Sequence, residues 1–235
     1  THLINYGNPR QLNYMGFDKI LIMAAERGAW VTIVLCVKEY PNLDKGLLGE
    51  LLCYACQRKQ YKEAELLLKM GAYRSSEVSG LRAIQYAVEN KDWAMVGIFS
   101  QFPADEHDLS YYGLALLKAL QHQQRGIAKL LLLAGAKPYW RGYIKNYEME
   151  STLYYAVEHD YDELLADLIK HERGCDGTLA TSRRWLAADL AVLKKNERAI
   201  ELLVEFRISD SFFINKPDLV CRLVVEALAI GNREI

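Results

Sequence analysis

The order of apolar and polar positions along the chain is the same in several successive segments. An apolar stretch ends near an alanine, a short polar break follows, and a leucine-rich stretch comes next. Apolar stretches of this length, separated by polar breaks, are typical of short amphipathic helices joined by turns. Breaks such as Glu89–Asp92 and Glu158–Asp160 therefore predict antiparallel helix pairs, whose second helix supplies a leucine ridge such as Ala64–Leu68.

The alanine before the polar break recurs at a nearly constant interval. Successive repeat alanines are separated by 31, 32, 32, 37, 35 and 36 residues, the differences between their numbers. These intervals bracket the period of about 33 or 34 residues found in two families of helical repeats. The repeat alanines are Ala24, Ala55, Ala87, Ala119, Ala156, Ala191 and Ala227.

A second regularity lies eleven residues after the repeat alanine. The residue there is apolar in the complete repeats except the fifth, which has Asp167 with Leu168 beside it, and this predicts a one-residue shift in that repeat. The apolar residues are Leu35, Leu66, Ile98, Leu130 and Leu202. Glycines that supply a left-handed residue are expected to end the second helices, at Gly71, Gly135 and Gly174. Because one pair cannot bury both apolar faces, we expect the pairs to stack.

Three segments resemble the ankyrin repeat family. Leu66–Ala72 and Leu130–Pro138 are similar to the end of the second ankyrin helix, where Leu-Leu-Leu leads to Gly-Ala and a turn. Ser151–Ala156 is similar to the Thr-Pro-Leu-His-x-Ala opening. The resemblance implies an all-α, ankyrin-like helical repeat solenoid of about six full repeats plus a partial one. No repeat keeps both the Pro and the His of the opening, which implies short or missing hairpins.

The same pattern predicts the domain organisation. Residues 1–17 are expected to form a lead-in or N-terminal cap, and residues 18–235 the repeat array. Since residues 227–235 have the pattern of the middle of a repeat, we expect the array to continue beyond them. Tetratricopeptide or another α-solenoid packing is the alternative, but the Trp-Leu-Gly…Tyr pattern and the closing proline of the tetratricopeptide family are absent from the sequence.

Composition restricts the classes of partner. The chain has 29 Lys and Arg against 30 Asp and Glu, so its net charge of −1 lacks the basic field that non-specific nucleic-acid binding needs. Five cysteines without a framework spacing indicate reduced thiols in a cytoplasmic protein. No apolar run approaches the length of a membrane span, and no signal peptide is visible. We expect a monomer that binds another protein, and no nucleic acid or membrane span.

The resemblance also implies where a partner docks. Ankyrin-like proteins bind on the concave side, and the two residues after each alanine pair are expected to project there. They are Glu26, Arg27, Gln57, Arg58, Glu89, Asn90, Gln121, His122, Glu158, His159, Leu193 and Lys194. Of this polar row, the candidate partner-binding residues are Arg27, Arg58, Asn90, His122 and His159. The alternative is that each is only a solvated helix end.

The longest interval between repeat alanines contains an aromatic segment, Pro138–Tyr147. It has four aromatic residues and two cations in ten positions, and Tyr, Trp and Arg are enriched among the residues that dominate binding energy at interfaces. Tyr139, Trp140, Arg141 and Tyr143 are therefore candidate partner contacts. Two alternatives are that the rings cover the apolar edge between two poorly matched repeats, or that they stack on single-stranded nucleic acid.

Candidate catalytic and metal sites are incomplete. Cys53 and Cys56 have metal-like spacing but no second pair, so they predict buried residues of a helix. The acidic segment Asp105–Asp108 predicts a turn between repeats rather than a calcium loop. His122 and His159 have no cysteine in the same register to serve as a nucleophile, and no phosphate-binding or hydrolase motif is present. We expect no catalytic residue, cofactor or metal in this chain.

The sequence thus favours a protein-recognition module. One alternative is a substrate-targeting or regulatory domain of a larger enzyme, and another is a structural spacer. Strongly degenerate ankyrin-like arrays also resemble those of effector proteins that intracellular bacteria or large DNA viruses send into eukaryotic cells, which implies action in the cytosol of a host cell.

Overall fold

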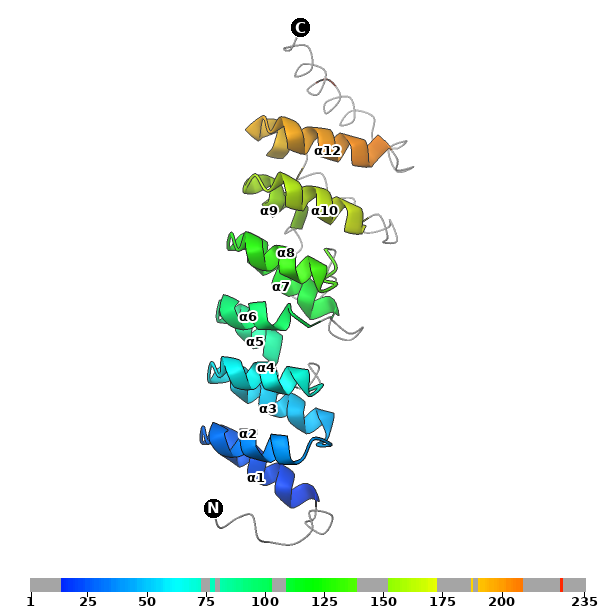
Figure 1. Ribbon diagram of the computed structural model, residues 1–235. Helices are drawn as coiled ribbons and strands as arrows, with labels where there is room; N and C mark the ends of the chain where they lie inside the picture. The colour runs from blue at the N-terminus through cyan, green and yellow to red at the C-terminus, as the bar shows by residue number, and fades with distance from the viewer. Residues whose placement is uncertain are drawn as a thin grey trace. The chain divides into compact units, whose positions relative to one another are not determined.

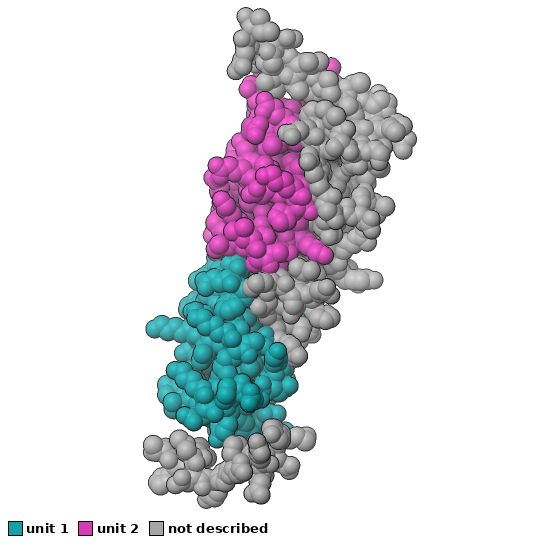
Figure 2. All heavy atoms as spheres, turned by 45° about the vertical axis from the view of Figure 1, so that its right-hand side comes forward, with its two compact units in different colours: residues 1–102 teal, residues 103–235 magenta. Residues whose placement is uncertain are grey.

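The described part of the chain is mostly helical. The computed structural model describes residues 14–72, 77–78, 81–102, 109–138, 152–172, 187, 190–208 and 225. This confirms the all-α class; within these residues the strands form a single two-residue pair, β1 (Glu77–Val78) with β2 (Leu81–Arg82). The chain divides into two compact units, residues 1–102 and residues 103–235 (Figure 2).

Unit 1 contains three antiparallel helix pairs. They are α1 (Tyr14–Glu26) with α2 (Trp30–Glu39), α3 (Lys45–Gln57) with α4 (Tyr61–Lys69), and α5 (Ala83–Glu89) with α6 (Trp93–Phe99). First helices pack on first helices, α1 on α3 and α3 on α5, while α4 packs on α6. The turns inside the three pairs consequently lie along one edge of the unit, at the left in Figure 1.

Unit 2 repeats this arrangement. It contains α7 (Leu109–Gln121) with α8 (Arg125–Leu133), α9 (Thr152–Glu158) with α10 (Asp162–Glu172), and α12 (Glu197–Ile208), which helical residues 190–194 precede. Here α7 packs on α9, and α10 packs on α12. Each unit therefore contains helix pairs that follow one packing rule.

The turn inside each pair has the same geometry in all six described repeats. The backbone N–H five residues after the repeat alanine donates to the alanine carbonyl, at 2.8 Å for Gln60 to Ala55 and 3.0 Å for Asn196 to Ala191. The residue four after the alanine has a positive φ, as in a Schellman helix ending. These residues are Gly28, Lys59, Lys91, Gln123, Asp160 and Lys195. The next residue is already the N-cap of the second helix, as at Gln60 before α4, so the turn is as short as the two helices allow.

The second helices bury a stripe in a fixed register. The residues nine after the repeat alanine are at most 1% exposed; they are Ile33, Ala64, Val96, Ala128, Leu165 and Ile200. Those twelve after it are at most 2% exposed in five repeats; they are Leu67, Phe99, Leu131, Leu168 and Leu203. The two positions are three residues apart on one helix face, and this face makes the core.

Two sequence expectations about this register are wrong. The eleventh residue is not a consistently buried position, because Leu35 is 56% exposed and Leu130 42% exposed, although Leu202 is buried. The fifth repeat has no one-residue shift, because Leu168 is the twelfth residue after Ala156 and is fully buried like its counterparts. In runs of adjacent leucines, the sequence pattern had suggested the eleventh residue after the repeat alanine, whereas the consistently buried one is the twelfth.

Other helix ends agree with the sequence. Gly71 and Gly135 have φ values of +80° and +95°, and the following Ala72 and Ala136 donate back to the leucine five residues earlier at 3.0 and 2.9 Å. Gly174 lies outside the described residues. Residues 14–17, expected as part of the lead-in, are the first turn of α1, and residues 1–13 are not described.

Candidate functional site

The candidate row of partner-binding residues lies at the turns between first and second helices. Arg27, Arg58 and Asn90 are exposed at the ends of α1, α3 and α5 in unit 1. His122 and His159 are half-buried at the ends of α7 and α9 in unit 2. Because every turn has the same Schellman geometry, the third residue after each repeat alanine occupies an equivalent place. Within each unit the turns therefore form one edge, the turn edge.

Arg58 uses its side chain within unit 1. Its Nη2 donates to the backbone carbonyl of Glu26, the last residue of α1, at 2.6 Å. Tyr54, one turn earlier on α3, donates its hydroxyl to the Glu26 carboxylate at 3.0 Å. Burial raises the pKa of the Tyr54 phenol, and the hydrogen bond to Glu26 raises it further. Arg58, at the end of α3, thus donates to the Glu26 carbonyl, which has no hydrogen-bond partner within α1 because it lies at the C-terminus of that helix.

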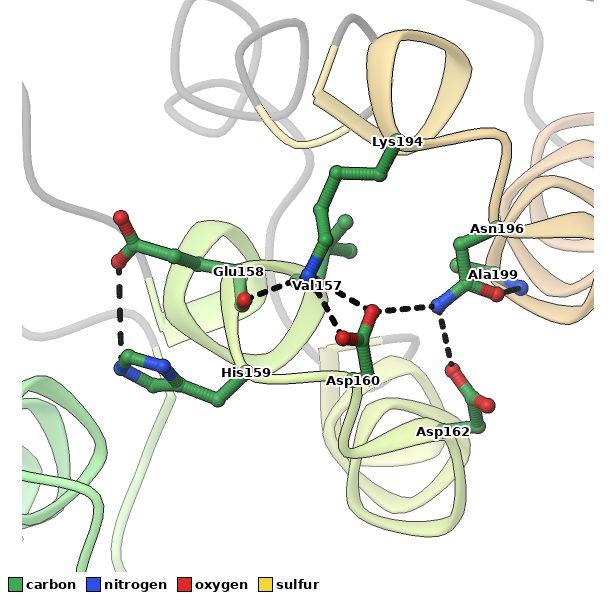
Figure 3. Close-up of polar contacts among 8 residues, drawn as sticks. All are labelled: Val157, Glu158, His159, Asp160, Asp162, Lys194, Asn196 and Ala199. Carbon is green, nitrogen blue, oxygen red and sulfur yellow. Dashed lines mark hydrogen bonds and ion pairs between the residues drawn. The ribbon is translucent and has the colours of Figure 1, made fainter.

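Lys194 has the equivalent role in unit 2, as Figure 3 shows. Its ammonium donates to the carbonyls of Val157 and Glu158 at 3.2 and 2.6 Å, and it lies 2.8 Å from the Asp160 carboxylate. The Asp160 pKa is lowered, chiefly by the hydrogen bond from Lys194. Asn196 links Asp160 to Asp162, at 3.2 and 3.1 Å. A cation at the third position therefore ties one turn to the preceding turn in both units.

His159 lies in a group of aromatic rings. Its ring stacks on Tyr155 at a centroid distance of 6.2 Å and contacts Tyr161 at 5.7 Å. Its Nε2 is buried and has no hydrogen-bond partner, and the nearest carboxylate oxygen, on Glu158, is 3.9 Å away (Figure 3). Arg125 lies over the Tyr161 ring at 5.6 Å. The ring thus packs at the turn edge rather than extending from it.

Asn90 also bonds inside its own repeat. Its Nδ2 donates to the carbonyl of Tyr86, four residues earlier, at 2.9 Å. The link to the neighbouring turn comes instead from Tyr61, whose hydroxyl donates to the Asp92 carboxylate at 3.2 Å. Asp92 additionally caps the N-terminus of α6 through the Met95 N–H at 3.1 Å. Sequence reasoning missed this tie, although Tyr61 and Asp92 are separated by 31 residues, one repeat interval.

A further tie in unit 2 was also missed. Arg125, the first residue of α8, pairs with Glu163 of α10 at 2.8 Å. The Tyr161 hydroxyl donates to the carbonyl of Gln123 at 3.3 Å. Both contacts join residues 38 positions apart, close to the 37-residue interval between the two repeat alanines. The sequence signal that could have identified these residues is their separation by about one repeat interval.

The aromatic candidates Tyr139, Trp140, Arg141 and Tyr143 lie outside the described residues. The residues that flank them are described on both sides. The Thr152 hydroxyl donates to the carbonyl of Pro138 at 3.2 Å, and this contact is buried. The two described residues that flank the segment, Pro138 and Thr152, thus lie together near the start of α9.

The cysteine pair is buried, as the sequence predicted. Cys53 and Cys56 on α3 are each 2% exposed, and both are free thiols. Burial raises the pKa of the Cys56 thiol well above its usual value. In the part of the chain that the structure describes, no group of three or more His, Cys, Asp and Glu side chains could hold a metal ion. Asp105–Asp108 is outside that part.

The chain was compared with known protein families, curated proteins and solved structures. The chain matches no protein-family model, no curated protein and no solved structure. None of the described helices is both long and apolar enough to cross a bilayer.

Proposed function

We propose that this chain is a protein-recognition module built as an ankyrin-like helical repeat array. The observation that carries the proposal is the turn shared by six repeats, with an alanine carbonyl closed by the N–H five residues later. A fixed turn places side chains of equivalent number side by side within each unit. Repeated, preformed edges of this kind suit protein binding, since little ordering cost is paid on association.

The proposed partner contacts lie in two separate places: the turn edge of each unit, and the aromatic segment after Pro138, whose described flanks lie at the start of α9, the end of that helix away from the turn edge. Arg27 and Arg58 expose guanidinium groups on the edge of unit 1, and Leu193 exposes 76% of its surface on the edge of unit 2. We assign partner contacts to Arg27 first, because Arg58 and Lys194 also serve ties inside the chain.

A structural spacer is the second candidate, and one observation favours it. The turn-edge cations Arg58 and Lys194 donate to carbonyls of the preceding turn rather than pointing only to solvent. In a spacer, the turn edge would serve to stiffen the stack. A regulatory or targeting domain of a larger enzyme uses the recognition surface in the same way and gives the same result in the experiment below.

Affinity capture from a eukaryotic cytosolic lysate tests the proposal. The wild-type chain is compared with a Trp140→Ala/Arg141→Ala variant, an Arg27→Ala variant and a Lys170→Ala control. Lys170 is an exposed cation of α10 away from the turn edge. Recognition predicts one retained protein that is lost with the first or second variant and kept with the control. Retention of no specific protein by the wild-type chain favours the spacer.

A further inference from the structure

Three cations on the turn edge of unit 1 are exposed and unpaired within the described part of the chain. Arg27, Lys59 and Lys91 lie one on each of the three successive turns that join first and second helices. None of their side chains makes a hydrogen bond or an ion pair with a described residue. We call these three residues the cation row, and their donor groups are available to a ligand.

The carboxylates of the same three turns are not partners of the cation row. Glu26, Glu89 and Asp92 each accept a hydrogen bond from a neutral side chain of the chain itself, at 3.0, 3.2 and 3.2 Å. On the turn edge of unit 2, in contrast, Asp160 pairs with Lys194 at 2.8 Å. The turn carboxylates of unit 1 are thus held by neutral donors, and the cation row remains free for carboxylates from elsewhere.

The rest of unit 1 supplies no further carboxylate. Residues 1–13, 73–76 and 79–80 are the part of unit 1 outside the description, and none of them is Asp or Glu. The acidic segment Asp105–Asp108 belongs to unit 2 and follows the end of α6 that lies away from the turn. An acidic partner of the cation row must therefore come from beyond unit 1.

The cation row has a regular spacing. Because α1 packs on α3 and α3 packs on α5, successive turns should be about 8–10 Å apart, the usual distance between the axes of packed helices. A polyproline II segment has three residues per turn and rises about 3.1 Å per residue, so every third side chain recurs on one side after about 9 Å. Acidic residues at every third position of such a segment match the spacing of the row.

Two members of the row are lysines where the backbone favours glycine. Lys59 and Lys91 have a φ of +54°, whereas Gly28 occupies the equivalent place in the first turn. A lysine in the left-handed region adds conformational strain to the turn. The turn therefore does not need these lysines for its geometry, and their exposed ammonium groups favour a role in binding.

We propose that the cation row binds an extended acidic segment of a partner protein, in which every third residue places a carboxylate opposite one cation. The inference rests on the proposed function and names the chemistry of the partner at the turn edge of unit 1. The contacts are charge-assisted hydrogen bonds at an exposed surface, so the affinity is modest and falls with salt.

A peptide suits the row better than a single-stranded nucleic acid does. A nucleic acid carries a charge on every nucleotide and would also bring phosphates against Glu26, Glu89 and Asp92. Spaced carboxylates avoid that repulsion. The net charge of −1 also lacks the basic field that binding to a nucleic-acid backbone needs.

Fluorescence anisotropy with two synthetic peptides and the whole chain tests the inference. The probe is a fluorescein-labelled peptide of four Glu-Pro-Pro units, whose prolines favour polyproline II. The control peptide has the same composition and label, with its glutamates adjacent at one end. At low ionic strength we expect the probe to bind about threefold more tightly than the control peptide or better, because only the probe offers a carboxylate to each turn.

Variants of the chain separate the row from other cations. Arg27→Gln, Lys59→Gly and Lys91→Gly should each weaken probe binding about twofold to fivefold. Lys38→Gln, at an exposed lysine in the last turn of α2, is the matched control and leaves binding unchanged. The glycine variants relieve backbone strain, so they should unfold at higher urea concentrations while they bind the probe more weakly. Loss of folding cannot produce that combination.

Three results overturn the inference. The first is a probe that does not bind, that binds no better than the control peptide, or that Lys38→Gln weakens as much as the row variants do. The second is tighter binding of a single-stranded thymidine oligonucleotide of the same charge. The third is stronger probe binding by an Asp105→Asn/Glu106→Gln/Asp108→Asn variant, because the chain's own acidic segment would then occupy the row.

Failure of the probe is distinguishable from failure of the proposed function. A protein that is retained in affinity capture and lost with Arg27→Ala, together with a probe that does not bind, overturns the acidic ligand and leaves protein recognition standing. Probe binding that shows the expected pattern supports the acidic ligand whether or not the lysate contains the partner.

Discussion

The guanidinium of Arg58 donates a 2.6 Å hydrogen bond to the carbonyl of Glu26, the last residue of the preceding first helix. Lys194 makes the same contact with Glu158 at the same distance. Both cations are the third residue after a repeat alanine, and both accepting residues end a first helix. One register position thus ties neighbouring turns in two different units.

Replacing Lys194 tests whether this tie stabilises unit 2. Lys194→Met should lower the free energy of unfolding by about 1–2 kcal/mol, because two charge-assisted bonds to helix-terminal carbonyls are lost. Lys194→Arg should retain most of the stability, since Arg58 fills the equivalent position in unit 1. Urea unfolding followed by circular dichroism measures both. Lys170→Met, at a 74% exposed lysine, is the control. If Lys170→Met lowered the free energy of unfolding as much as Lys194→Met, the contact between the turns would not be the cause.

The Asp160 carboxylate gives the tie a pH dependence. Its pKa is lowered from the usual 3.8 in the folded chain, first through the hydrogen bond from Lys194. The stabilisation is therefore present above pH 3.8 and is lost as pH falls through the lower, folded-state pKa. Because the side chain is 58% exposed, the effect should stay below about 1 kcal/mol.

Unfolding midpoints of the wild-type chain and Asp160→Asn check this. Between about pH 4 and pH 2, the midpoint of the wild-type chain should fall more steeply than that of the variant. Parallel curves would show that Asp160 does not contribute to the acid dependence.

His159 provides a test of the buried, unpartnered Nε2. His159→Phe keeps a ring against Tyr155 and Tyr161 and removes a polar atom that has no hydrogen bond. We expect unchanged or higher stability, by up to about 1 kcal/mol, because an unsatisfied buried group is costly. His159→Ala, which removes the ring contacts, should lower stability by about 1 kcal/mol or more. Thermal unfolding of both variants measures these changes in stability. A clear loss of stability in His159→Phe would mean that Nε2 has a hydrogen-bond partner in solution.

The left-handed residues of the turns are a further test. Lys59 and Lys91 have a φ of +54°, where a side chain is strained, whereas Gly28 occupies the same place without strain. Lys59→Gly should therefore raise the free energy of unfolding by about 0.5–1 kcal/mol. Gly28→Ala should lower it by a similar amount, since no atom lies within 4 Å of the added Cβ and only the backbone is strained. Equal effects of opposite sign in chemical denaturation confirm the shared turn; a stabilising Gly28→Ala contradicts it.

The sequence was sufficient for the helix pairs and insufficient for their side-chain register. The repeat alanines marked the turns because only a small residue fits where the helices meet, and Ala55, Ala119 and Ala156 are fully buried. Runs of adjacent leucines such as Leu66–Leu68 span more than half a helical turn, so their phase could not be fixed without the partner helix. Non-glycine residues in the left-handed turns also gave no signal, because Lys59 and Gln123 are ordinary helix residues.

The candidate site shows the same division. Position in the repeat correctly located Arg58 and His159 at helix ends, but a side chain's partner depends on the neighbouring turn. The tie from Arg58 to Glu26 and the buried ring of His159 follow from packing across repeats. Tyr61 and Tyr161 lie just beyond the turns and were not considered, although each reaches the neighbouring turn.

Hydrogen–deuterium exchange of the chain with the protein retained in affinity capture tests the central claim most directly. Amide exchange is measured for the chain alone and in the complex, and the difference is mapped on the repeats. Recognition by the proposed surface predicts protection at the turns around Arg27 and Arg58 and in the segment Tyr139–Tyr143, with little change in α8. Absence of protection anywhere in the chain, or protection confined to the outer faces of the second helices, contradicts it.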